Sequence, residues 1–127
     1  MSDTKCGGLL LSDDLLFGSR ITGTAEKLGL TVHTVRSADE LLRQAEQVRP
    51  RCVLLDLQNP GLEIETVATR LKTLIPPPML VAYGSHVDAA TLHRAREAGC
   101  DRVLPRSQFV EELSLTLSTW LRGEPGA

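Results

Sequence analysis

The sequence lacks paired cysteines, long hydrophobic runs and blocks of like charge. Its cysteines, Cys6, Cys52 and Cys100, are an odd number in distant segments without a Cys-x-x-Cys pair, which favours reduced, buried thiols. No apolar stretch approaches the ~20 residues that span a bilayer, and the N-terminus lacks a secretory signal pattern. Charges of both signs are interspersed, with a net charge of −2. We therefore expect a cytoplasmic protein that binds neither a membrane nor nucleic acid directly.

The length and composition indicate one globular domain. Of the 127 residues, 42% are hydrophobic and 24% are charged, which is enough to build a core without disulfides or metal ions. We expect residues 8–122 to form the domain, with short tails at residues 1–7 and 123–127.

Short apolar runs alternate with amphipathic stretches along the whole chain. This alternation is typical of βα units. The expected strands are residues 9–11, 30–35, 52–55, 79–83 and 102–104. The expected helices between and after them are residues 21–28, 37–48, 64–74, 88–98 and 109–121. The pattern predicts an α/β protein with a doubly wound, parallel five-stranded sheet in the order 2-1-3-4-5, a (βα)5 fold.

Three carboxylates follow the strands that flank the predicted crevice of this sheet. Asp13 and Asp14 come after residues 9–11, and Asp56 comes directly after residues 52–55. Because ligands bind beyond the carboxyl ends of parallel strands, we expect these side chains to converge there. Carboxylates held this close repel one another unless a cation joins them, and a donor set made only of oxygens favours Mg²⁺. The constellation predicts phosphoryl transfer to a carboxylate.

A simpler interpretation remains for part of this set. An Asp after a strand is commonly the N-cap of the next helix, and Asp13 or Asp14 fits that role equally well. Asp56 is harder to explain in this way. A carboxylate at the end of a buried strand is costly unless it is paired, hydrated or bound to something.

At this point the chain resembles the receiver domain of two-component response regulators. The resemblance covers about residues 8–122 and rests on Asp13-Asp14, on residues 53–57 with the following Asn59-Pro60-Gly61, and on residues 95–101. It implies a flavodoxin-like fold and a signalling role without enzyme activity of its own. It further implies that a histidine kinase or phosphotransfer protein phosphorylates Asp56. Mg²⁺ would then lie on Asp13, Asp14, Asp56 and the backbone carbonyl of Gln58.

Two positions depart from the family pattern. The family has Thr or Ser at the end of the fourth strand, where this chain has Gly84 followed by Ser85. It has Lys-Pro after the fifth strand, where this chain has Arg106 after Pro105. We assign the phosphoryl-contacting roles to Ser85 and Arg106, and expect signalling to a downstream protein through the face of residues 88–121. The same face could also form a homodimer.

An alternative from another class stays open. A pseudo-receiver would keep the scaffold and bind protein partners without phosphorylation, which the missing lysine and the displaced hydroxyl favour.

Two single residues also keep two interpretations each. His86 is either a sensor of phosphoryl or pH or a solvated loop residue. Trp120 is either an anchor for a partner or a core residue.

Overall fold

Five short apolar segments form one parallel sheet in this computed structural model, which describes residues 7–122. The strands are β1 (Gly8–Leu11), β2 (Val32–Val35), β3 (Cys52–Asp56), β4 (Met79–Gly84) and β5 (Arg102–Pro105). They pair in the order β2-β1-β3-β4-β5, and every pair is parallel. The predicted fold class and strand order are therefore confirmed.

Five helices connect and follow the strands. They are α1 (Leu15–Lys27), α2 (Ala38–Val48), α3 (Ile64–Lys72), α4 (Ala89–Glu97) and α5 (Arg106–Arg122). Ser37 caps α2, because its side chain accepts a hydrogen bond from the Glu40 N–H. The last helix begins at Arg106, three residues before the predicted start. None of the helices in residues 7–122 has the length and apolar character that crossing a membrane requires.

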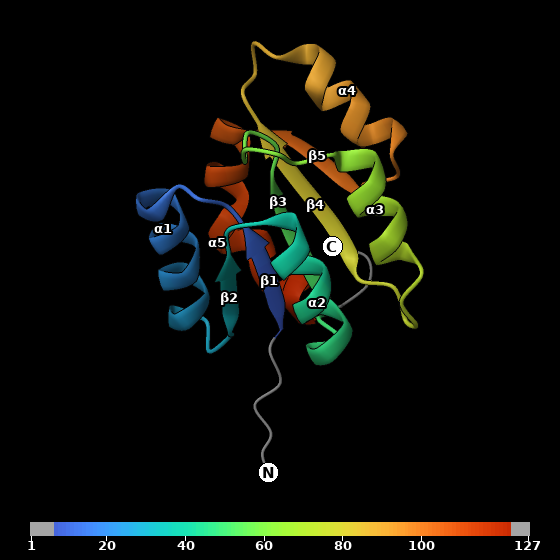
Figure 1. Ribbon diagram of the computed structural model, residues 1–127. Coiled ribbons are helices and arrows are strands. Elements are labelled where there is room, and N and C mark those ends of the chain that lie inside the picture. Colours follow the sequence, from blue (N-terminus) through green and yellow to red (C-terminus); the bar gives the residue numbers. More distant parts are fainter. Residues whose placement is uncertain (1–6, 123–127) are drawn as a thin grey trace.

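The helices cover both faces of the sheet, and the central strands β1 and β3 are completely buried (Figure 1). One face carries Leu9, Leu11, Val53 and Leu55 beneath α2, α3 and α4. The alternate residues point to the other face, where α1 and α5 pack together. This two-sided burial explains why β1, β3 and β4 are apolar nearly throughout.

All four aromatic residues of the chain lie in the second core, between the sheet, α1 and α5. They form a continuous stack, with ring centroids 5.3 Å apart for Phe17 and Tyr83, 4.5 Å for Tyr83 and Phe109, and 5.9 Å for Phe109 and Trp120. Trp120 is fully buried in this stack. It is therefore a core residue and not an exposed anchor for a partner.

The cysteines are free within the described part of the chain. Cys52 is buried in β3, and Cys100 is half-buried after α4. Burial raises the pKa of the Cys100 thiol to about 11, which keeps it protonated at neutral pH. Cys6 lies outside the described residues, as do most of the predicted N-terminal tail and the predicted C-terminal tail.

Candidate functional site

The register between β1 and β3 places Ser12 beside Asp56 at the carboxyl edge of the sheet. Leu11 pairs with Leu55, so the next residues, Ser12 after β1 and Asp56 at the end of β3, lie level with each other. The Ser12 hydroxyl donates a hydrogen bond to Asp56 Oδ2 at 2.8 Å. Ser12 is 1% exposed and Asp56 is 5% exposed. The buried carboxylate thus has a fixed neutral donor on one oxygen.

The loop after β3 holds the second oxygen of Asp56. The backbone N–H of Gln58 donates to Asp56 Oδ1 at 3.0 Å, and the N–H of Asn59 donates to the Asp56 carbonyl at 3.0 Å. This compact turn is one that Asp forms readily with its own backbone. Two hydrogen bonds therefore offset much of the cost of burying the carboxylate and fix its orientation.

Asp14 has a different set of partners from Asp56. Its Oδ1 accepts a hydrogen bond from the Phe17 N–H at 3.0 Å, which makes Asp14 the N-cap of α1. Its Oδ2 accepts from Arg106 Nη2 at 2.7 Å. The same guanidinium lies over the Phe17 ring, 4.0 Å from its centroid. The helix-cap interpretation is therefore confirmed for Asp14, and Arg106 at the start of α5 holds its second oxygen.

The structure does not bring the three predicted carboxylates together. Within residues 7–122, no three His, Cys, Asp or Glu side chains are placed to share a metal ion. Asp14 is turned toward the start of α1 and toward Arg106, Asp13 is exposed, and the position level with Asp56 is occupied by a serine. The metal-binding roles assigned to Asp13, Asp14, Asp56 and Gln58 stay predictions.

A smaller set of oxygen donors still suits Mg²⁺. The Asp13 carboxylate forms no ion pair with any described residue, and it follows Ser12, the neighbour of Asp56. Mg²⁺ is commonly held by one or two carboxylates with several waters and a phosphate oxygen. Asp13, Asp56 and the Gln58 carbonyl fit this description. Asp14 could bind the ion through Oδ2 only after its ion pair with Arg106 is broken.

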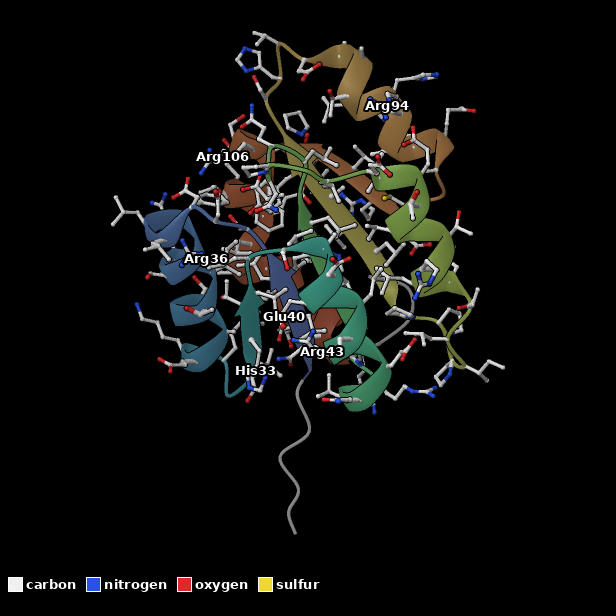
Figure 2. All side chains as sticks on the ribbon, viewed as in Figure 1. His33, Arg36, Glu40, Arg43, Arg94 and Arg106 are labelled. Carbon is white, nitrogen blue, oxygen red and sulfur yellow. The ribbon has the colours of Figure 1, made fainter. Side chains whose placement is uncertain are left out.

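The predicted phosphoryl-contacting residues do lie near one another. Ser85, Arg106 and Gln58 line one cavity of about 530 Å³ at the carboxyl edge of the sheet. Figure 2 shows Arg106 at this edge, whereas His33 lies toward the opposite end of β2. Gly84 offers no side chain, and a Cβ at this position would meet Leu57 at 3.4 Å. Ser85, the residue directly after β4, therefore supplies the hydroxyl that lines the cavity on this side.

Sequence reasoning missed two buried polar residues of this region, Ser12 and Tyr83. Tyr83 pairs with Asp56 in the β3–β4 register, and its hydroxyl has no hydrogen-bond partner among the described residues. Burial, aided by the nearby negative charge of Asp56, raises the pKa of Tyr83 above its ordinary value. Ser12 could have been found from its place directly after an apolar strand. Tyr83 reads in the sequence as an ordinary strand residue.

Replacement of Arg106 by glutamine is expected to raise the pKa of Asp14. The Phe17 N–H and the Arg106 guanidinium together hold the pKa of this carboxyl below its ordinary value of 3.8. The stabilisation from the lowered pKa is present at neutral pH and is lost as the pH falls through the folded-state pKa. An NMR titration of the Asp14 side-chain carbon measures the change. The pKa should stay below its ordinary value because the Phe17 N–H remains.

The matched control for this prediction is Arg102→Gln, which removes the arginine at the start of β5. Arg102 pairs with Glu112 and not with Asp14. The control should leave the Asp14 titration unchanged. An Arg106→Gln variant with the wild-type Asp14 pKa would contradict the pairing seen here.

Comparison with solved structures identifies the fold. The receiver domain of NtrX from Brucella abortus matches with a TM-score of 0.77 and 21% sequence identity, over 91% of this chain and 98% of that domain. The receiver domain of the Francisella response regulator 1452 matches with a TM-score of 0.76 and 15% identity, over 91% of this chain and 96% of that one. A longer NtrX chain matches with a TM-score of 0.77, and this protein spans 26% of it.

These likenesses show that the chain has the receiver-domain fold. No protein-family model matches the sequence, and no curated protein matches it either.

Proposed function

We propose that this chain, which has the receiver-domain fold, accepts a phosphoryl group on Asp56 and acts as a response-regulator receiver in a phosphorelay. The observation that supports this most is the environment of Asp56. It is a buried carboxylate at the carboxyl end of a central strand, oriented by the Ser12 hydroxyl and the Gln58 N–H. A structural carboxylate has little reason to occupy such a place.

The proposed chemistry is nucleophilic. A carboxylate oxygen of Asp56 attacks the phosphorus of a phosphohistidine, so that an O–P bond forms while the N–P bond breaks and the imidazole nitrogen keeps the electron pair. Arg106 and Ser85, which line the adjoining cavity, stabilise the phosphoryl oxygens. A bound Mg²⁺ would neutralise charge on those oxygens, held by Asp13, Asp56 and the Gln58 carbonyl.

The proposed partners follow from the same assignment. A histidine kinase or a phosphotransfer protein supplies the phosphoryl group. The surface of α4, β5 and α5 carries the signal to a downstream protein or to a second copy of the chain. On α5 this surface includes Leu115, a large apolar side chain that is 81% exposed.

Incubation with phosphoramidate and Mg²⁺, followed by intact mass measurement, tests the proposal. The wild type should gain one phosphoryl group, and Asp56→Asn should gain none. Asp39→Asn, which changes an exposed carboxylate on α2, is the matched control and should react like the wild type. An unmodified wild type, or equal modification of Asp56→Asn, would end the proposal.

A second candidate is the pseudo-receiver, a module that binds protein partners without phosphorylation. The Asp14–Arg106 pair favours it, because both side chains are already committed to each other. Under this alternative, Asp56→Asn leaves partner binding and oligomeric state unchanged. Substitutions on the surface of α4 and α5 abolish them.

A further inference from the structure

The carboxyl edge of the sheet carries a cavity that extends beyond the surroundings of Asp56. This cavity has a volume of about 530 Å³ and lies between α1, the loops after β3 and β4, and the start of α5. A second hollow of about 380 Å³ shares Phe17, Arg20 and Arg106 with it. The two Arg side chains therefore lie at the junction of both hollows, within a volume that suits a small organic molecule.

The charge of this cavity is opposite to that of the chain as a whole. The protein has a net charge of −2, yet the linings of the two hollows include Arg20, Arg106 and His86 and a single acidic residue, Asp14. Asp14 is already paired with Arg106. Among residues 7–122, neither Arg20 nor His86 forms an ion pair. Arg20 is therefore an unneutralised cation at the cavity wall.

Neutral donors supplement these cations. The Ser85 and Ser107 hydroxyls and the Gln58 side chain also line the cavity. Helix α5 begins at Arg106, so the backbone N–H groups of its first turn have no partner within the helix. Guanidinium groups, hydroxyls and free amides are the donors that bind phosphate best in proteins.

The remaining lining is apolar. Phe17 and Val110 lie on the α1 and α5 sides of the cavity. The Arg106 guanidinium rests on the Phe17 ring and is held there by Asp14, so it is oriented before any ligand arrives. A ligand with an apolar body would gain from these contacts, which a bare inorganic ion cannot use.

We propose that this cavity binds a small organic phosphate monoester, with Arg20 as the main contact to the phosphate and the half-buried Val110 against the organic group. The inference stands on the cavity itself and does not require phosphorylation of Asp56. The bound molecule is a ligand and not a phosphoryl donor.

Titration with phenyl phosphate, followed by backbone amide NMR, tests the proposal. Saturable shifts are expected at residues 17–20, 85–86 and 106–107. Arg20→Ala should weaken binding about tenfold, the effect of losing one charge-assisted contact, and Arg20→Lys by less. Arg70→Ala on α3, an exposed arginine that lines neither hollow, is the matched control and should bind like the wild type.

Two further measurements distinguish an organic from an inorganic ligand and binding from phosphorylation. Inorganic phosphate should bind more weakly than phenyl phosphate, and equal affinity would overturn the assignment of an organic ligand. The intact mass of the wild type should not change on incubation with phenyl phosphate, so the outcome is independent of the phosphorylation test. The absence of saturable shifts, or equal affinity in Arg20→Ala and Arg70→Ala, would overturn the proposal.

Discussion

Replacement of Phe109 by alanine is expected to lower the free energy of unfolding by about 4 kcal/mol. Phe109 is fully buried and lies at the centre of the aromatic stack, 4.5 Å from the Tyr83 ring and 5.9 Å from the Trp120 ring. Truncation removes these two ring contacts and a third to Phe17 at 6.2 Å, and it leaves a cavity between α5 and the sheet that rigid neighbours fill only in part. Denaturant unfolding monitored by Trp120 fluorescence and by circular dichroism measures the loss.

Two controls define what this loss means. Phe109→Leu keeps most of the volume and should cost about 1.5 kcal/mol. Leu115→Ala removes an apolar side chain of α5 that is exposed, and should change stability by no more than about 0.5 kcal/mol. A Phe109→Ala loss close to that of Leu115→Ala would show that the stack does not hold α5 against the sheet.

The fold could be predicted because the burial of apolar side chains, which stabilises it most, produces recognisable patterns within short segments of the sequence. Strands that are covered on both faces are apolar at consecutive positions, as in residues 9–11 and 53–55. In the intervening helices, apolar residues recur every three or four positions. The start of α5 was missed because its first turn, Arg106 to Gln108, is polar and carries no apolar repeat. The boundary of a helix depends on tertiary contacts such as the Arg106–Asp14 pair.

The site could be predicted only in part, for a related reason. Asp56 stands out because a charge directly after an apolar strand is costly, and this is a local signal. Asp14 and Asp56 each have one side-chain partner that is distant in the sequence. Arg106 is 92 positions from Asp14, and Ser12 is 44 positions from Asp56. The register between β1 and β3 decides which of the residues 12–14 lies beside Asp56. That residue is Ser12, one position before the first of the two expected carboxylates, so a hydroxyl lies there and not a carboxylate.

Replacement of Ser12 by aspartate is expected to destabilise the protein by about 3 kcal/mol at neutral pH without divalent cations. Ser12 is buried and donates to Asp56 Oδ2. The substitution removes that donor and places a second negative charge beside the first. Because a shared proton relieves the repulsion, the loss should shrink as the pH is lowered.

The same substitution is expected to create a strong site for Mg²⁺, because it places a second carboxylate at the position level with Asp56. Mg²⁺ at a hundredfold excess over its dissociation constant should then restore about 2.7 kcal/mol. Ser12→Asn matches aspartate in size without its charge, and Mg²⁺ should stabilise it far less. If Ser12→Asp and Ser12→Asn lost the same stability and gained equally from Mg²⁺, then the charge at this position would not govern metal binding. In that case the hydroxyl of Ser12 would serve only to hold Asp56 in place.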